Sequence, residues 1–297
     1  MTPAWSPWSR LQPALTLTPA TLAELLDGGQ AFRWQAGPNG LWTGVWDRYV
    51  VRLRSGPDGQ VEWSAPAPAA AATGPALARY LGLNTDVTAR LDALPWRSDP
   101  HLAACLQTFP GLRILRQPFG ETLLGFLCSA TKQIVQIKQM MALLAARHGE
   151  PLPFPAAPET GHRLPTWPHL ATVPEADLRA CLLGFRARYI HATAQVLADQ
   201  PGWLDETERL PYEEAKARLC SLPGVGEKVA DCVLLFGAGR MEAFPVDVWI
   251  IKTMARRYGL DGWTPAQVAH FGRVHFGASA GLAQQYLFAW ERRMGGR

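Results

Sequence analysis

The spacing of apolar residues changes near residue 65, and this change divides the chain into two parts. Before it, short stretches rich in Trp, Val and Tyr are separated by the turn sequences GPNG and GPDG, which predicts β-strands. After it, apolar residues recur every three to four positions, which predicts helices. The expected strands cover residues 31–34, 41–54 and 61–63. One short helix is expected before the strands, at residues 18–29. The helices expected after residue 65 cover 74–92, 120–148, 174–199, 212–220, 226–236, 247–258, 264–276 and 281–293.

This order of elements predicts an α+β fold with two domains. Residues 1–95 are expected to form a small antiparallel β-sheet domain with helices, and residues 96–297 a larger all-α domain. The Ala/Pro-rich run 65–73 is expected to be a linker or exposed loop. Residues 151–168 contain six prolines and are expected to form an irregular connection.

The composition excludes several classes of protein. With 48% hydrophobic and 18% charged residues, the 297-residue chain is not expected to be disordered. Its net charge of +4 permits a polyanionic partner without requiring one. The five cysteines include no C-x2-C pair, so neither zinc nor an iron–sulfur cluster is expected. We find no secretion signal and no apolar run near the ~18 residues of a membrane span, so we expect a soluble, cytoplasmic protein.

The strongest local feature is the sequence LCSLPGVGEKVADCVLLF at residues 219–236. It predicts two helices joined by a tight turn that contains Leu222, Gly224, Val225 and Gly226. Backbone N–H groups exposed at the start of the second helix can bind a DNA phosphate without regard to base sequence. The alternative is an ordinary turn between helices. The bracketing hydrophobic residues favour a helix-hairpin-helix DNA-binding motif.

Two charged residues near this hairpin suggest a reaction. Lys228 follows the turn, and Asp247 opens an apolar helical run in AFPVDVWII. Taken singly, Lys228 could be a phosphate contact and Asp247 only a helix N-cap. Together, an amine and a carboxylate in one cleft could attack a sugar C1′ and stabilise the positive charge that develops on the ribose.

These residues carry a resemblance to a known family. The arrangement LPGVGEKVADCVLLF…AFPVDVWI is similar to the helix-hairpin-helix, Gly/Pro-Asp superfamily of base-excision DNA glycosylases. The segments GQAFRWQ, LRILRQPFGETLLGFLCS, LGFRARYI and GLAQQYLF resemble 8-oxoguanine DNA glycosylases of the eukaryotic type, in order along roughly residues 15–292. The four-Cys iron–sulfur loop of the endonuclease III branch is absent from this sequence.

The resemblance implies a bifunctional enzyme that removes 8-oxoguanine from duplex DNA and cleaves the strand by β-elimination. Lys228 would be the nucleophile that forms a Schiff base, and Asp247 the supporting carboxylate. It also implies a pocket for the flipped base. In that pocket the Gly29 carbonyl would accept from N7–H of the oxidised base, Gln284 would read its Watson–Crick edge, and Cys232 and Phe288 would form the walls.

The resemblance also assigns residues that contact DNA around the pocket. Phe185 would be an aromatic wedge and Arg186 a contact to the orphaned cytosine, with Thr131 at the position that plugs the gap in the duplex. Backbone carbonyls of Cys220, Leu222 and Val225 could hold a structural monovalent or divalent cation. No cofactor is expected in catalysis, and a monomer is expected to act on DNA, in the nucleoid if the source is bacterial.

Two departures from the family pattern concern the base opposite the lesion. Thr131 stands where the family has asparagine, and Gln136 where it has a second arginine for the opposite cytosine. A shorter plug and a missing arginine predict a relaxed opposite-base preference. Two alternative functions stay open: a glycosylase of the same fold that acts on alkylated or other oxidised purines, and a non-catalytic helix-hairpin-helix DNA-binding protein.

Overall fold

The computed structural model describes residues 4–154 and 161–294. Its strands are β1 (Ser9–Arg10), β2 (Trp34–Ala36), β3 (Trp42–Trp46), β4 (Tyr49–Ser55) and β5 (Val61–Ser64). Its α-helices are α1 (Pro19–Asp27), α2 (Ala70–Tyr80), α3 (Val87–Asp92), α4 (Pro100–Thr108), α5 (Phe119–Leu127), α6 (Ile134–His148), α7 (Trp167–Thr172), α8 (Glu175–Leu178), α9 (Arg186–Asp199), α10 (Trp203–Arg209), α11 (Tyr212–Cys220), α12 (Glu227–Val233), α13 (Val248–Tyr258), α14 (Pro265–Phe276) and α15 (Ala280–Met294). Short 3-10 or π segments lie at Pro38–Gly40, Ala67–Ala69, Arg179–Leu183, Leu234–Ala238 and Gly277–Ser279.

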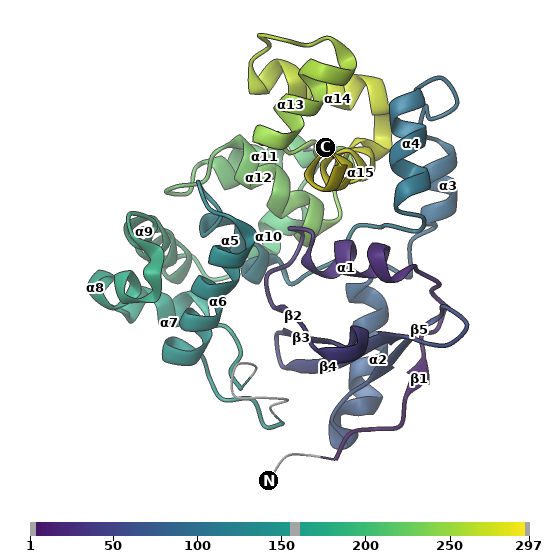
Figure 1. The fold of residues 1–297 in the computed structure, drawn as a ribbon. Coiled ribbons are helices and arrows are strands. Elements are labelled where there is room, and N and C mark those ends of the chain that lie inside the picture. Colours follow the sequence, from purple (N-terminus) through teal and green to yellow (C-terminus); the bar gives the residue numbers. More distant parts are fainter. Residues whose placement is uncertain (1–3, 155–160, 295–297) are drawn as a thin grey trace.

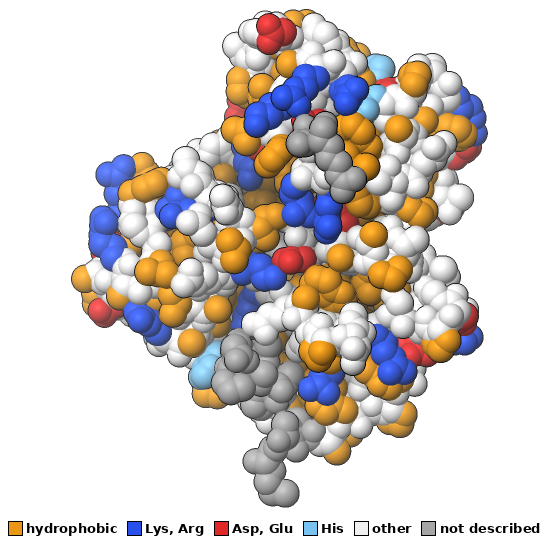
Figure 2. All heavy atoms as spheres, viewed as in Figure 1, with side chains coloured by type: hydrophobic (Ala, Val, Ile, Leu, Met, Phe, Trp, Pro, Cys, Tyr) orange, Lys and Arg blue, Asp and Glu red, His pale blue; other side chains and the backbone are white. Residues whose placement is uncertain are grey.

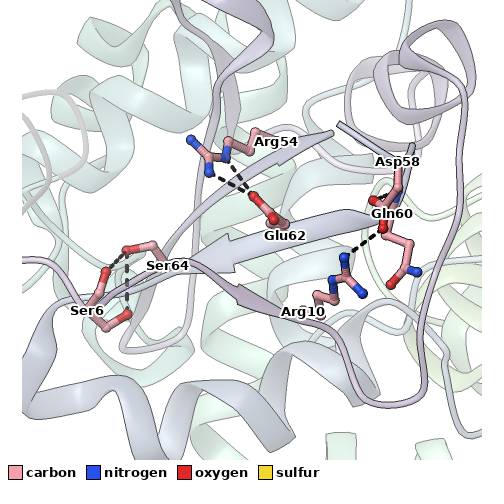
Figure 3. Close-up of polar contacts among 7 residues, drawn as sticks. All are labelled: Ser6, Arg10, Arg54, Asp58, Gln60, Glu62 and Ser64. Carbon is pink, nitrogen blue, oxygen red and sulfur yellow. Dashed lines mark hydrogen bonds and ion pairs between the residues drawn. The ribbon is translucent and has the colours of Figure 1, made fainter. Parts of the chain in front are cut away.

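The strands form one antiparallel sheet in the order β1-β5-β4-β3-β2, which confirms the predicted α+β fold. Ion pairs Arg54–Glu62 and Arg10–Asp58 join neighbouring parts of this sheet (Figure 3). The sheet packs on α2 through a cluster of aromatic rings, in which Trp46 stacks near Tyr80 with ring centroids 4.5 Å apart. The aromatic residues on the face of the sheet that contacts α2 therefore form part of the hydrophobic core.

The helices surround the sheet on two sides and leave a hollow between them. Helices α6–α9 form one lobe and α10–α15 another, and α1 lies between the sheet and the C-terminal helices (Figure 1). Basic side chains gather around the hollow where the three lobes meet (Figure 2). One buried apolar cluster runs through all of them and includes Leu94 and Leu102. The domain boundary after residue 95 therefore stays a prediction.

Several predicted helices are divided in the structure. The stretch 74–92 contains α2 and α3, and 120–148 contains α5 and α6 with a loop between them. The run 65–73 is not a linker throughout, because α2 already begins at Ala70. Of the Pro-rich connection 151–168, residues 155–160 lie outside the described residues. Within the described ranges, no helix has the length and apolar character to cross a membrane.

Candidate active site

The hairpin turn joins the end of α11 at Cys220 to the start of α12 at Glu227. The Leu222 and Val225 side chains are buried, whereas Gly224 and Gly226 are exposed. Gly224 has φ +79°, and a Cβ there would lie 2.7 Å from Tyr189 of α9. The turn therefore presents backbone rather than side chains to solvent, and it is held closely against α9.

Lys228 lies in the first turn of α12 and is half-buried. Its Nζ lies 3.5 Å from Ser129 Oγ and 5.0 Å from the centroid of the Phe126 ring. Both contacts come from α5 or the loop after it, so the amine is fixed between two elements. A cation above an aromatic face is also weakly attracted to it.

Asp247 is the N-cap of α13, and its Oδ1 accepts from the backbone N–H groups of Trp249 at 3.0 Å and Ile250 at 2.9 Å. Burial raises the pKa of Asp247, while the Ile250 N–H, the Lys228 amine and the Trp249 N–H oppose the rise. The carboxylate thus has a structural role as a cap and an electrostatic relationship with Lys228.

Lys228 and Asp247 share one small pocket with all four predicted base-pocket residues. The pocket has a volume of about 40 Å³ and is lined by Gly29, Phe126, Lys228, Cys232, Phe236, Pro245, Asp247, Gln284, Gln285 and Phe288. This volume is small compared with that of most ligand pockets. We therefore expect lining side chains to move when a ring the size of a purine enters.

Two buried side chains of this pocket, Gln284 and Cys232, differ in their hydrogen bonding and in their ability to ionise. Gln284 donates from Nε2 to the Pro245 carbonyl at 3.1 Å, and its buried Oε1 has no hydrogen-bond partner among the described residues. An unpaired buried acceptor is costly unless a donor reaches it. Burial raises the pKa of the Cys232 thiol to about 12, so this side chain is neutral at physiological pH. Among these side chains, the Lys228 amine is the better candidate nucleophile.

Gly29 is held in a left-handed conformation beside Phe288. Its φ is +94°, and a Cβ would lie 3.2 Å from Ile134 Cδ1 and 3.5 Å from Phe288 Cε1. The next residue, Gln30, is fully buried, and its amide donates to the Arg113 carbonyl and accepts from the Leu115 N–H, each at 3.0 Å. The backbone around Gly29 is therefore fixed before any base arrives.

The predicted DNA-contact residues lie outside this pocket, on two neighbouring loops. Arg186 is 3% exposed, and all three of its guanidinium nitrogens donate: to the Ala130 and Leu183 carbonyls and to Thr131 Oγ1. Phe185 is 47% exposed and Leu182 is 52% exposed. Arg186 thus joins the two loops, and its guanidinium also lies 4.4 Å from the centroid of the half-exposed Phe185 ring.

Two further predicted positions have local structural contacts. Gln136 belongs to a capping box at the start of α6, where its Oε1 accepts from the Gln133 N–H at 3.2 Å. Cys220 is the last residue of α11. Within the described residues, no group of three or more His, Cys, Asp or Glu side chains could hold a metal ion.

Phe126, Phe236, Pro245 and Gln285 also line the pocket and were not predicted. Phe126 and Phe236 stack with ring centroids 5.6 Å apart. In the sequence both have the spacing of ordinary core residues, and no local pattern distinguishes them. Pro245 could have been found, since it lies two residues before Asp247.

Comparison with known proteins supports a common ancestry over nearly the whole chain. A model of the 8-oxoguanine DNA glycosylase N-terminal domain matches residues 14–123, and one of the HhH-GPD superfamily base excision DNA repair proteins matches residues 124–274. The N-glycosylase/DNA lyase OGG1 of Arabidopsis thaliana is 33% identical over 98% of this chain and 81% of its own length. A probable N-glycosylase/DNA lyase of Methanothermobacter thermautotrophicus is 32% identical over 69% of this chain and 71% of its own length. The Clostridium acetobutylicum 8-oxoguanine glycosylase/lyase, solved with duplex DNA containing cytosine opposite 8-oxoguanine, superposes with a TM-score of 0.84 at 30% identity over 92% of both chains.

Proposed function

The chain belongs to the 8-oxoguanine DNA glycosylases of the HhH-GPD superfamily, and from this we propose that Lys228 and Asp247 carry out its reaction. The protein is an N-glycosylase/DNA lyase that removes 8-oxoguanine from DNA. The observation that supports the residue assignment is the single pocket that Lys228 and Asp247 share with Gly29, Cys232, Gln284 and Phe288. A non-catalytic DNA-binding role would leave this convergence unexplained.

We propose that the pocket identifies the base by its hydrogen-bond donors. Guanine N7 is an acceptor, whereas 8-oxoguanine carries a hydrogen there, so the Gly29 carbonyl attracts the damaged base and repels the normal one. The unpaired Oε1 of Gln284 would accept from the Watson–Crick edge of the base. Cys232 and Phe288 would enclose the two faces of the ring.

The proposed reaction begins when Lys228 Nζ, after it has released a proton to solvent, attacks C1′ of the flipped nucleotide. The C1′–N9 bond breaks, its electron pair leaves with the base, and the amine proton moves to the departing base. Asp247 stabilises the positive charge that develops on the ribose in the transition state. The sugar ring then opens to a Schiff base, C2′ loses a proton, and the 3′ phosphate leaves by β-elimination.

DNA would be held by the hairpin and by the two neighbouring loops. The exposed backbone at Gly224 and Gly226, supported by the buried Leu222 and Val225, is suited to a phosphate. Exposed Phe185 is suited to insertion between bases as a wedge. We propose that Thr131 and Arg186 act with it on the strand opposite the lesion.

We also propose that a monovalent or divalent cation can be held by the backbone carbonyls of Cys220, Leu222 and Val225. The last carbonyls of a helix lack an intrahelical donor, and Cys220 ends α11. Such an ion would stabilise the hairpin and take no part in bond breaking. The proposed base pocket is complete within one chain, so we expect the protein to act on DNA as a monomer, in the cytoplasm and associated with the nucleoid if the source is bacterial.

Borohydride trapping on DNA with 8-oxoguanine opposite cytosine tests the assignment. The unmodified protein should form a covalent adduct, because borohydride reduces the Schiff base to a stable amine. Lys228→Gln should form none. Lys252→Gln, which changes an exposed lysine of α13, is the matched control and should trap like the unmodified protein. An adduct with Lys228→Gln would show that another amine is the nucleophile.

A further inference from the structure

A fully buried acid lies in α1, five residues before Gly29. Glu24 of α1 is 0% exposed, and its Oε2 accepts from Arg292 Nη2 at 2.5 Å and Arg293 Nε at 3.0 Å. Its Oε1 is buried without a hydrogen-bond partner among the described residues. A buried carboxylate is stabilised only by such partners, and it holds them firmly in return.

One of the two arginines that bind Glu24, Arg292, lies on the side of α15 that also carries two predicted pocket residues. Gln284, Phe288 and Arg292 are spaced four residues apart and therefore share one side of the helix. Phe288 lies beside Gly29, while Arg292 binds Glu24 of the same short helix. The end of α15 lies close to α1 (Figure 1). One helix face thus carries two base-pocket residues and an ion pair to α1.

A second helix, α6, contacts the Gly29 segment through a similar pair of residues. Ile134 and Lys138 of α6 are also four residues apart. Ile134 is the nearest neighbour of a Cβ at Gly29, and Lys138 Nζ pairs with Asp27 Oδ1 at 2.7 Å. The last turn of α1 is therefore held by charges from two sides, and each side also supplies one apolar contact to Gly29.

We propose that these two ion pairs, Glu24 with Arg292 and Arg293 and Asp27 with Lys138, are positioning elements that set where the Gly29 carbonyl meets the base. This rests on the proposed contact between that carbonyl and N7–H. Without the ion pairs, α1 could shift along α15, and the carbonyl would lose its alignment with the base. Lys228 and Asp247 lie on other helices and would keep their places.

Measuring the two steps of the reaction separately distinguishes a loss of base positioning from a general loss of protein stability. Excision of 8-oxoguanine needs the base to be read, whereas cleavage at a preformed abasic site needs only Lys228 chemistry. We expect Glu24→Gln to lower the single-turnover rate of 8-oxoguanine excision by roughly ten- to a hundredfold, as a small misplacement of a contact group does. The rate at which Glu24→Gln cleaves DNA at an abasic site should stay within about twofold of the rate of the unmodified protein. A change of that size is too small to indicate a loss of catalysis.

The second ion pair allows a test that does not depend on a buried charge. Asp27→Lys and Lys138→Asp should each weaken excision, and the double variant should recover it, because the pair is restored with its charges exchanged. Glu62→Gln, which breaks the Arg54–Glu62 pair of the sheet (Figure 3), is the matched control and should change neither step. An equal loss in both steps, or no loss in excision, would overturn the proposed positioning role. Failure of the unmodified protein to trap on 8-oxoguanine DNA would instead overturn the function itself.

Discussion

The proposed base pocket and the two loops proposed to face the opposite strand are built differently. Side chains of α5, α12, α15 and the start of α13 line the pocket, and Cys232 and Gln284 are buried within it. The loops instead present Phe185 and Leu182 to solvent. A buried pocket can reject a base through one unpaired hydrogen-bonding group, whereas exposed loops can adapt to several opposite bases. The pocket is thus suited to strict recognition of the damaged base, and the loops are suited to permissive recognition of the opposite base.

Backbone strain distinguishes the loops further. Four non-glycine residues among those described have a positive φ: Asn39, Asp47, Thr131 and Leu182. Asn and Asp tolerate this conformation, but a β-branched or bulky residue does so at a cost. The two costly cases, Thr131 and Leu182, lie on the two loops proposed to contact DNA, and Arg186 connects both loops through Thr131 and Leu183. Strain of this kind is concentrated at functional sites.

The largest effect should come from removing the pocket carboxylate. Asp247→Asn keeps a good N-cap for α13 but removes the negative charge, and excision should fall by about 10²–10³-fold, as with other lost transition-state contacts. Because burial raises the pKa of Asp247, activity of the unmodified protein should decline, on lowering the pH, before the pKa of ordinary aspartates near ~3.9 is reached. Single-turnover rates across pH measure both effects. An unchanged acid limb in the variant would contradict the role of Asp247.

An intermediate effect should come from a methyl group in the pocket. Gly29→Ala adds a Cβ beside Ile134 and Phe288 at φ +94°, and the left-handed strain of about 1–2 kcal/mol should lower 8-oxoguanine excision about tenfold or more. Gly202→Ala is the matched control: its φ is +87°, with no atom within 4 Å of the added Cβ. It should lose similar stability in thermal unfolding but keep excision. Equal excision by both variants would mean that the pocket is less rigid than its packing indicates.

The smallest effect should be the difference in the 8-oxoguanine excision rate between duplexes with different bases opposite the lesion. Because Thr131 is short, Gln136 caps α6 and Arg186 is bonded within the protein, excision of 8-oxoguanine opposite the four bases should differ by less than about tenfold, the equivalent of one weak contact. Single-turnover excision from the four duplexes measures this. Strong discrimination in favour of cytosine would show that Arg186 leaves its bonds to Ala130 and Thr131 when DNA binds.

The sequence predicted regular elements better than their interruptions. The predicted helix 18–29 begins with Thr18, a residue type that favours the N-cap position, and Thr18 Oγ1 accepts from the Thr21 N–H at 3.0 Å at the start of α1. The loop after α5 was hidden, because apolar spacing continues through residues 120–148. The left-handed Leu182 was hidden as well, since a leucine gives no signal of a turn.

The same contrast holds for the site. The hairpin and Lys228 have a local signal, whereas Gly29, Gln284 and Phe288 were identified by family resemblance and stay predictions in their roles. The Glu24–Arg292 contact joins residues 268 positions apart. No local pattern contains such a pair, because only the packing of α1 on α15 brings it together.

The small volume of the base pocket has a consequence for the search along DNA. At about 40 Å³, the pocket is expected to open each time a base is tested, so every visit would have an energetic threshold at its entrance. In the proposed role of the Gly29 carbonyl, a normal guanine that enters would meet a repelling acceptor and would leave before any bond is broken. Undamaged sites would then be rejected by the fit of the base in the pocket rather than by the later covalent steps.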